Sequence, residues 1–138
     1  MAENEIGDQR FHQGVDYFNG KDFFNAHEVW EELWLCTFDE SREFLQGLIQ
    51  WSLALYHFSR GNMRGARGLF VSGAALLAPY GEVFKGVNLA HLKRQMETCL
   101  AEVLSNPLEK LAGKDGGAGL LRFVPDPTNM PEIEVIAP

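Results

Sequence analysis

The sequence has few cysteines, no run of basic residues and no long apolar stretch. Its two cysteines, Cys36 and Cys99, form no CxxC or CxxH pair, which argues against a disulfide framework or a cysteine zinc site and favours free, inert thiols in a reducing compartment. Lysine and arginine are scattered through a chain of formal net charge -7, so nucleic acid is not expected as a partner. The longest nearly uncharged stretch, residues 44–58, is too short to span a bilayer. These absences predict a soluble cytoplasmic protein with no membrane partner.

Fingerprints of the common enzyme classes are missing as well. No GxSxG, Walker or dinucleotide-binding motif occurs. What the sequence does contain is 46% hydrophobic residues, among them ten Phe, three Trp and three Tyr in 138 residues. This composition is typical of one globular domain with a substantial core.

Apolar residues recur at helical spacing in five segments. The expected helices cover about residues 9–19, 22–36, 41–59, 62–78 and 88–104. The third is apolar almost all round, which is typical of a helix at the centre of its domain. A glycine turn followed by an alanine occurs at residues 20–26 and again at 61–66, which indicates helical hairpins within one bundle. The predicted fold is therefore all-α, a compact bundle of about five helices formed by residues 1–104.

Residues 105–138 differ in character from the helical part. They hold five of the six prolines and a glycine-rich stretch at 113–119, so an irregular tail is expected. The tail also carries several large apolar residues near 120–123 and 133–136. We expect these residues to pack on the bundle or on a partner subunit.

Two polar stripes stand out on the second and third expected helices. At 100° per residue, one stripe of the second helix holds His27, Trp30, Glu31 and Trp34, with Glu28 beside it. The only polar stripe of the third helix holds Gln46, Gln50, Leu53 and His57. A short connection favours antiparallel packing of these helices. The two stripes would then face each other and enclose a small pocket.

Two interpretations of this pocket remain open. In the first, the glutamine amides bond to His27 and Glu31 and form a buried polar network between the two helices. In the second, His27, Glu31 and His57 bind a divalent metal such as zinc, iron or manganese, and Glu28 is a candidate base. Trp34, Gln46 and Gln50 would line the ligand pocket. The sequence HExxE differs from the HExxH of zinc proteases, because Glu31 occupies the second histidine position.

Three motifs in order resemble a known family. They are AHEVWEELW at residues 26–34, FLQGLIQ at residues 44–50, and His57 followed by GNMRGA at residues 61–66. Together they resemble the domain of unknown function 309 family over about residues 11–78. The resemblance implies a helical bundle and marks seven signature positions, namely His27, Glu28, Glu31, Trp34, Gln46, Gln50 and His57. The family has no established activity, although some members carry the label of metal-dependent hydrolases.

Two functions from different classes therefore follow. One is a non-enzymatic binding or assembly module, expected to form a homodimer through its aromatic-rich faces and apolar tail. The other is a metal-dependent hydrolase, or another small-ligand enzyme, that uses the His/Glu cluster and needs a cleft open to water.

Overall fold

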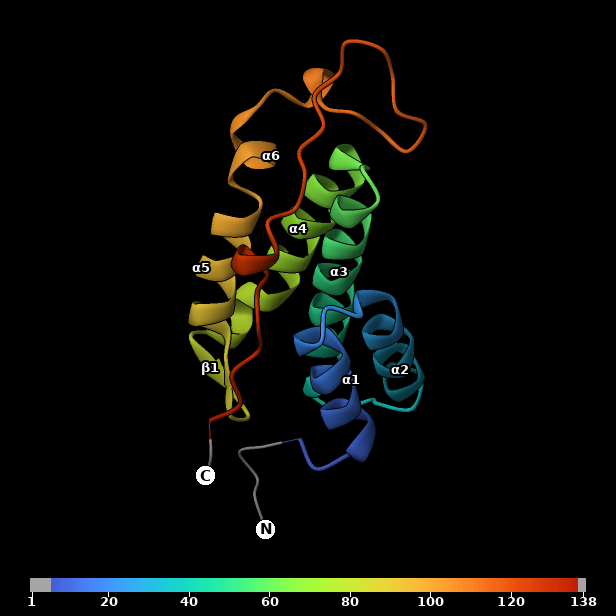
Figure 1. Cartoon of the computed structure of the whole chain (residues 1–138). Coiled ribbons are helices and arrows are strands. Elements are labelled where there is room, and N and C mark those ends of the chain that lie inside the picture. Colours follow the sequence, from blue (N-terminus) through green and yellow to red (C-terminus); the bar gives the residue numbers. More distant parts are fainter. Residues whose placement is uncertain (1–5, 137–138) are drawn as a thin grey trace.

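Helices dominate residues 6–136, the part of the chain that the computed structural model describes. The α-helices are α1 (Gln9–Asn19), α2 (Phe23–Leu35), α3 (Ser41–Ser59), α4 (Met63–Leu77), α5 (Leu89–Cys99) and α6 (Ala101–Ser105) (Figure 1). The prediction of an all-α fold is confirmed, and four of the five expected ranges agree within two residues. Residues 1–5 of the predicted bundle and residues 137–138 of the predicted tail lie outside the described residues.

Short polar side chains set where the helices begin. The carboxylate of Asp8 accepts a hydrogen bond from the backbone N–H of Arg10 at the start of α1. Asp22, Asn62 and Asn88 cap α2, α4 and α5 in the same manner. Such caps satisfy backbone donors that have no partner within the helix. The caps explain why the helices begin close to the positions that periodicity predicts.

Two hairpins, α1–α2 and α3–α4, are each locked by a tryptophan. In the first, Trp30 Nε1 donates to the carbonyl oxygen of Phe11 at 3.0 Å, and in the second, Trp51 Nε1 donates to that of Phe70 at 2.9 Å. Each indole also stacks on the ring of the phenylalanine that it bonds. A buried indole N–H needs an acceptor, so these bonds fix how the two helices of each hairpin approach.

Helix α3 is the centre of the bundle, as its apolar sequence predicts. It packs against α2 on one side and α4 on the other (Figure 1). Eleven of its residues are buried. Two of them, Ser41 and Ser52, are polar, and Ser52 donates its hydroxyl proton to the carbonyl oxygen of Ile49 at 2.9 Å. The aromatic and aliphatic side chains around α3 form a continuous core.

The region after α4 differs from the prediction in two ways. A 3-10 turn, η1 (Ala78–Tyr80), leads into a two-stranded antiparallel hairpin of β1 (Val83–Phe84) and β2 (Val87–Asn88), which the sequence analysis did not predict. Its turn residues, Lys85 and Gly86, have φ angles of 45° and 83°, and tight hairpins require positive φ at both central positions. The fifth expected helix is divided into α5 and α6. Its apolar face nevertheless continues through the interruption, because Met96, Leu100 and Val103 are all fully buried.

The segment after α6 is irregular and packs on the helices. It contains the short turns η2 (Leu108–Lys110) and η3 (Pro127–Asn129) and buries Leu111, Ala112 and Ile133. The carbonyl oxygen of Ala112 accepts hydrogen bonds from the first two N–H groups of α4. The chain then returns along the bundle (Figure 1), where Asn19 bonds to both the N–H and the C=O of Ile133. None of the helices within residues 6–136 has the length and apolar character needed to cross a membrane.

Candidate functional site

Helices α2 and α3 are antiparallel, as the short connection between them predicts. Phe24, near the start of α2, lies 5.3 Å from Tyr56, near the end of α3, between ring centroids. At the opposite end, the guanidinium of Arg42 lies 3.9 Å above the ring of Trp34. It also donates to the carbonyl oxygens of Trp34 and Thr37 at 2.8 Å each. Trp34 is therefore covered by Arg42 and does not form an open pocket wall.

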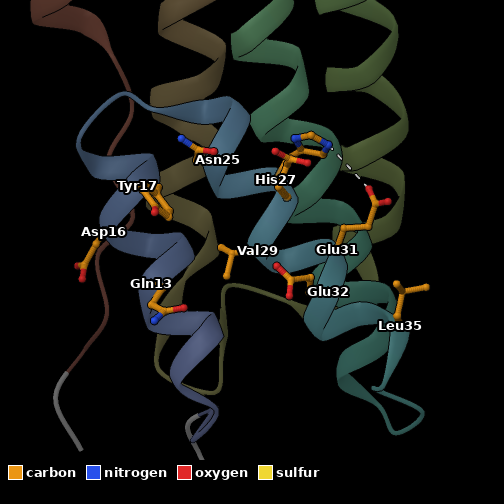
Figure 2. A pocket seen from close by; sticks show the side chains of 10 residues that line it. Gln13, Asp16, Tyr17, Asn25, His27, Val29, Glu31, Glu32 and Leu35 are labelled. Carbon is orange, nitrogen blue, oxygen red and sulfur yellow. Dashed lines mark ion pairs between the residues drawn. The ribbon is translucent and has the colours of Figure 1, made fainter.

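His27 and Glu31 lie next to each other on α2, as their spacing of four residues predicts. His27 Nδ1 lies 2.6 Å from the carbonyl oxygen of Phe24, and a carbonyl only accepts, so Nδ1 carries the proton. This bond turns Nε2 toward Glu31, whose carboxylate oxygen is 3.8 Å away (Figure 2). The imidazole is mostly buried, with 15% of its side chain exposed, whereas Glu31 is 55% exposed. The pair thus lies at the edge of the bundle.

The predicted polar network between α2 and α3 does not form. Gln50 accepts a hydrogen bond from the hydroxyl of Ser72 on α4. Gln46 is half-buried and makes no side-chain hydrogen bond within the described residues. The reason is that α3 lies between α2 and α4. The polar stripe of this central helix therefore has neighbours on both sides, and Gln50 bonds to α4 rather than to α2.

His57 is held by the helix that follows it. The side-chain oxygen of Asn62 accepts from the N–H of Gly65 at 2.9 Å, which directs the amide nitrogen toward His57 Nδ1 at 3.3 Å. Because that nitrogen only donates, Nδ1 is the acceptor, and the proton of the neutral imidazole is on Nε2. His57 is thus engaged in the turn between α3 and α4 and not in the pair formed by His27 and Glu31.

The three predicted metal ligands are consequently not gathered. No group of three His, Cys, Asp or Glu side chains within residues 6–136 is arranged to hold a metal ion. His27 and Glu31 supply two ligand atoms, whereas a protein zinc site uses three or four. The residues present therefore do not fit the three-ligand site that includes His57.

A groove along the outer side of α1 and α2 is the largest hollow at this site. Its volume is about 740 Å³. Three residues of α1 and seven of α2 line it (Figure 2): Gln13, Asp16, Tyr17, Asn25, His27, Glu28, Val29, Glu31, Glu32 and Leu35. Four of these are carboxylates, and none is lysine or arginine. Glu28 is exposed here, on the outer face of α2. None of the predicted pocket residues Trp34, Gln46 and Gln50 lines the groove.

Sequence reasoning missed this groove because its acids come from two helices. Glu28 and Glu32 are four residues apart, so they lie on one face of α2. Asp16 is on α1, and no periodicity shows that it faces the same space. The available signal was a row of charged residues opposite the apolar face of α2, which a solvated helix also shows.

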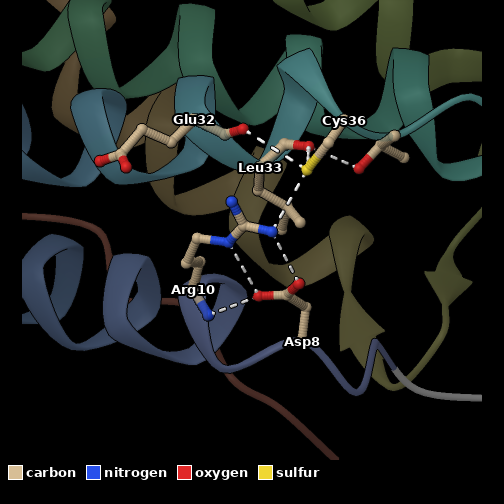
Figure 3. A network of polar contacts seen from close by, with 6 residues as sticks. Asp8, Arg10, Glu32, Leu33 and Cys36 are labelled. Atoms are coloured by element: carbon tan, nitrogen blue, oxygen red, sulfur yellow. Dashed lines mark hydrogen bonds and ion pairs between the residues drawn. The ribbon is translucent and has the colours of Figure 1, made fainter.

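A second polar cluster ties the start of α1 to the end of α2 (Figure 3). The Arg10 guanidinium bonds to both carboxylate oxygens of Asp8 and lies 3.2 Å from the sulfur of Cys36. These hydrogen bonds from Arg10 lower the pKa of Asp8. The contact of Cys36 with Arg10 joins residues that are 26 positions apart in the sequence. For Cys99, burial and then the charge of Asp126 raise the pKa of the thiol to about 11, so this cysteine is protonated at neutral pH, as expected of an inert thiol.

We predict that the pH dependence of stability depends on His57. Burial, and then the charge of Lys114, lower the pKa of His57 below its ordinary value of 6.5. The unfolded chain therefore binds the proton more readily, and the free energy of unfolding should fall as the pH drops below about 6.5. In urea titrations at a series of pH values, His57→Gln should show a shallower fall than the natural chain. His12→Gln, at an exposed histidine of α1, is the control, and an equal slope in all three proteins would contradict the prediction.

The comparison with known proteins matches part of the chain to the same family that the motifs resemble. Residues 11–69 match the family described as "Domain of unknown function (DUF309)". An uncharacterized protein of Aquifex aeolicus is 31% identical over 94 residues, which are 67% of this chain and 28% of the relative. The uncharacterized protein YpuF of Bacillus subtilis is 31% identical over 78 residues, which are 56% of this chain and 45% of the relative. The chain thus spans less than half the length of these curated relatives.

Proposed function

We propose that this chain is a non-enzymatic binding module of the cytoplasm that holds a basic amphipathic segment of a partner protein in the α1–α2 groove. The observation that carries the proposal is the lining of the groove, with four carboxylates and no lysine or arginine. A surface of one charge sign raises the encounter rate with a partner of the opposite sign and disfavours acidic partners.

Apolar side chains in the same groove provide the second half of the recognition. Leu35 is 62% exposed and Tyr17 is 43% exposed, and both line the groove together with Val29. Exposed apolar side chains that are rimmed by polar residues mark interaction sites. A helical partner with leucines on one face and lysines on the other would bury the apolar side chains and pair with the carboxylates.

The dimensions of the groove suit a helical segment. The residues of α2 that line the groove run from Asn25 to Leu35, which is about 15 Å along the helix at 1.5 Å per residue. A partner helix of about three turns would match that length. The acidic lining disfavours a second copy at the same place, because a two-fold dimer would set the same four carboxylates of each chain against each other. The predicted homodimer stays a prediction, and this charge argues that it would use another surface.

The lengths of the relatives support a module. The matched residues are 28% of the Aquifex aeolicus protein and 45% of YpuF. In both relatives the matched region is therefore joined to further sequence, which is the usual setting of a domain that binds another domain or another protein.

We predict that the groove binds a synthetic basic peptide that, as a helix, has leucines on one face and lysines on the other. Calorimetry with the full chain should give a dissociation constant in the micromolar range that weakens with salt. The double variant Glu28→Lys/Glu32→Lys should weaken binding by about tenfold or more, as opposite charges at a close interface are replaced by like charges.

Two matched controls make this test specific. The double variant Glu102→Lys/Glu109→Lys changes net charge equally at exposed positions outside the groove, and it should bind the peptide as the natural chain does. A scrambled peptide of identical composition cannot present an apolar face and should bind weakly. Equal loss in both double variants, or equal binding of both peptides, would mean unspecific charge attraction and would overturn the proposal.

A metal-dependent enzyme in which His27 and Glu31 are the protein ligands, without the predicted ligand His57, is a second candidate, and one observation favours it. The bond from His27 Nδ1 to the Phe24 carbonyl oxygen orients Nε2 toward Glu31, and metal-ligating histidines are commonly oriented by such a bond. Glu28 is exposed nearby as a candidate base. Elemental analysis of the untagged protein beside His27→Ala decides the question, because a metal site requires near-stoichiometric metal that the variant lacks.

A further inference from the structure

A second cavity lies between α4 and α5, the helices on either side of the β1–β2 hairpin (Figure 1). Its volume is about 260 Å³. Three of the side chains that line it, Trp51, Leu77 and Leu89, are at most 4% exposed, so the cavity reaches the hydrophobic core. Ala74 on α4 and Ala90 on α5 also line it, and their small side chains leave the space between the two helices open.

The apolar floor of this cavity is held in place by tight packing on its far side. Trp51 donates its indole N–H to the carbonyl oxygen of Phe70 and stacks on the ring of that residue. Leu77 lies against Gly47, where a β-carbon would come within 2.5 Å of its Cγ. Neither side chain can fill the cavity without losing these contacts. The cavity is therefore preformed, as binding sites for small molecules usually are.

Two charged residues of opposite sign line the same cavity, and a backbone contact brings them together. The carbonyl oxygen of Glu82 accepts a hydrogen bond from the N–H of Ala90 at 3.0 Å. Lys93 is three residues after Ala90 on α5, so it lies one turn along the same face of the helix. Both charged side chains are exposed, and they form no ion pair with each other. An apolar interior thus has one anion and one cation at its mouth.

We propose that this cavity binds a free α-amino acid with an apolar side chain, such as leucine. The ammonium group of the ligand would pair with Glu82 and its carboxylate with Lys93, through charge-assisted hydrogen bonds. Its side chain would occupy the apolar interior. The volume is below the roughly 300–1,000 Å³ of pockets for drug-sized molecules, which suits a ligand of this small size.

The pair of opposite charges is what selects a zwitterion over other apolar ligands. An apolar carboxylic acid would place its negative charge beside Glu82, and an apolar amine would place its positive charge beside Lys93. A side chain of a folded or extended peptide has no charge at its own α-position. Unpaired surface charges are common in this chain, so the assignment depends on both charges bordering one apolar cavity. The cavity shares no lining residue with the α1–α2 groove, so the inference goes beyond the proposed function.

The test is an NMR titration of the isotope-labelled full chain with L-leucine. We expect a saturable shift of the indole N–H signal of Trp51, with a dissociation constant in the micromolar to millimolar range for so small a ligand. The indole of Trp30 bonds to a backbone carbonyl in the same manner in the other hairpin, and its signal should not move. Absence of a saturable shift at Trp51 would overturn the proposal.

Ligand analogues separate the three parts of the recognition. N-acetylleucine lacks the ammonium charge, leucinamide lacks the carboxylate and glycine lacks the side chain, so each should bind about tenfold more weakly than leucine or not at all. N-acetylleucinamide has neither charge. If it bound as tightly as leucine, the cavity would take an apolar side chain of a peptide, and the assignment to a free amino acid would be wrong.

Variants assign each charge of the ligand to its partner. Glu82→Gln should weaken leucine binding by about tenfold but leave the affinity for N-acetylleucine unchanged, because that ligand has no ammonium group to lose a partner. Lys93→Gln should show the same pattern with leucinamide. Glu97→Gln, at an exposed position of α5 that does not line the cavity, should bind leucine as the natural chain does. Unaltered leucine affinity in the Glu82 and Lys93 variants, with amide spectra that show them folded, would overturn the proposal.

Discussion

Replacing Gly14 by alanine is expected to lower the free energy of unfolding by about 3 kcal/mol, through overpacking and a lost buried hydrogen bond. A β-carbon at this position would lie 2.0 Å from Trp30 Nε1 and 2.4 Å from Cδ1. The indole would have to move, and its hydrogen bond to the carbonyl oxygen of Phe11 would break. Gly73 faces Trp51 in the second hairpin in the same way, with a β-carbon 2.4 Å from Cδ1, so Gly73→Ala should have an effect of similar size.

Gly68 provides the matched control for these substitutions. It lies within α4, and a β-carbon built on it meets nothing within 4 Å. Gly68→Ala should therefore raise the free energy of unfolding by about 0.5–1 kcal/mol, since alanine favours a helix interior. Urea denaturation followed by tryptophan fluorescence measures all three variants. If Gly14→Ala were as stable as Gly68→Ala, the two indoles would not set the spacing of the hairpins.

Replacing Asn19 by alanine is expected to release the end of the tail and to lower the free energy of unfolding by about 2 kcal/mol, about 1 for each hydrogen bond. The amide of Asn19 accepts from the N–H of Ile133 at 2.7 Å and donates to its C=O at 3.0 Å. Ile133 is only 4% exposed. Loss of these two hydrogen bonds leaves the backbone N–H and C=O of Ile133 unpaired, so the tail should open locally before the bundle unfolds.

Hydrogen exchange measured by mass spectrometry checks this prediction. In Asn19→Ala, peptides that cover residues 131–136 should exchange much faster than in the natural chain, while those of α3 should keep their protection. Asn129→Ala is the control, because Asn129 is exposed on η3 and its side chain bonds to nothing within residues 6–136. Unchanged exchange in Asn19→Ala would mean that the β-bridge between Val135 and Val87 and the other tail contacts hold residues 131–136 in place without the hydrogen bonds of Asn19.

Apolar periodicity predicted most of the helical fold, for physical reasons that are local. Each of the helices α1 to α4 has an apolar face that depends only on its own residues. The polar caps of α1, α2 and α4 directly precede these helices in the sequence. The break at Leu100 was not predictable in this way, because Met96, Leu100 and Val103 keep helical spacing across it. The hairpin at residues 83–88 is too short for a strand pattern, and Lys85-Gly86 was its only signal.

The site was harder to predict because it depends on which neighbour each polar side chain reaches. His27 and Glu31 are four residues apart on one helix, so helix geometry alone placed them together. The partner of Gln50, Ser72, is on α4, and the partner of His57, Asn62, is in the turn before α4. No spacing within α3 distinguishes such partners from partners on α2. The contacts of Arg10 with Cys36 and of Arg122 with Gly61 join residues that are 26 and 61 positions apart, and they exist only once the chain has folded.

The most direct test of the central claim, that the α1–α2 groove binds a basic amphipathic helix, is to locate the bound peptide. A spin label on the leucine–lysine peptide should broaden the amide NMR signals of groove residues such as Asp16, Glu28 and Glu32 in the full chain. Signals at the far end of the bundle, around Gly61 and Arg122, should stay sharp. Broadening that is centred away from α1 and α2, or spread evenly over the surface, would contradict the groove as the binding site.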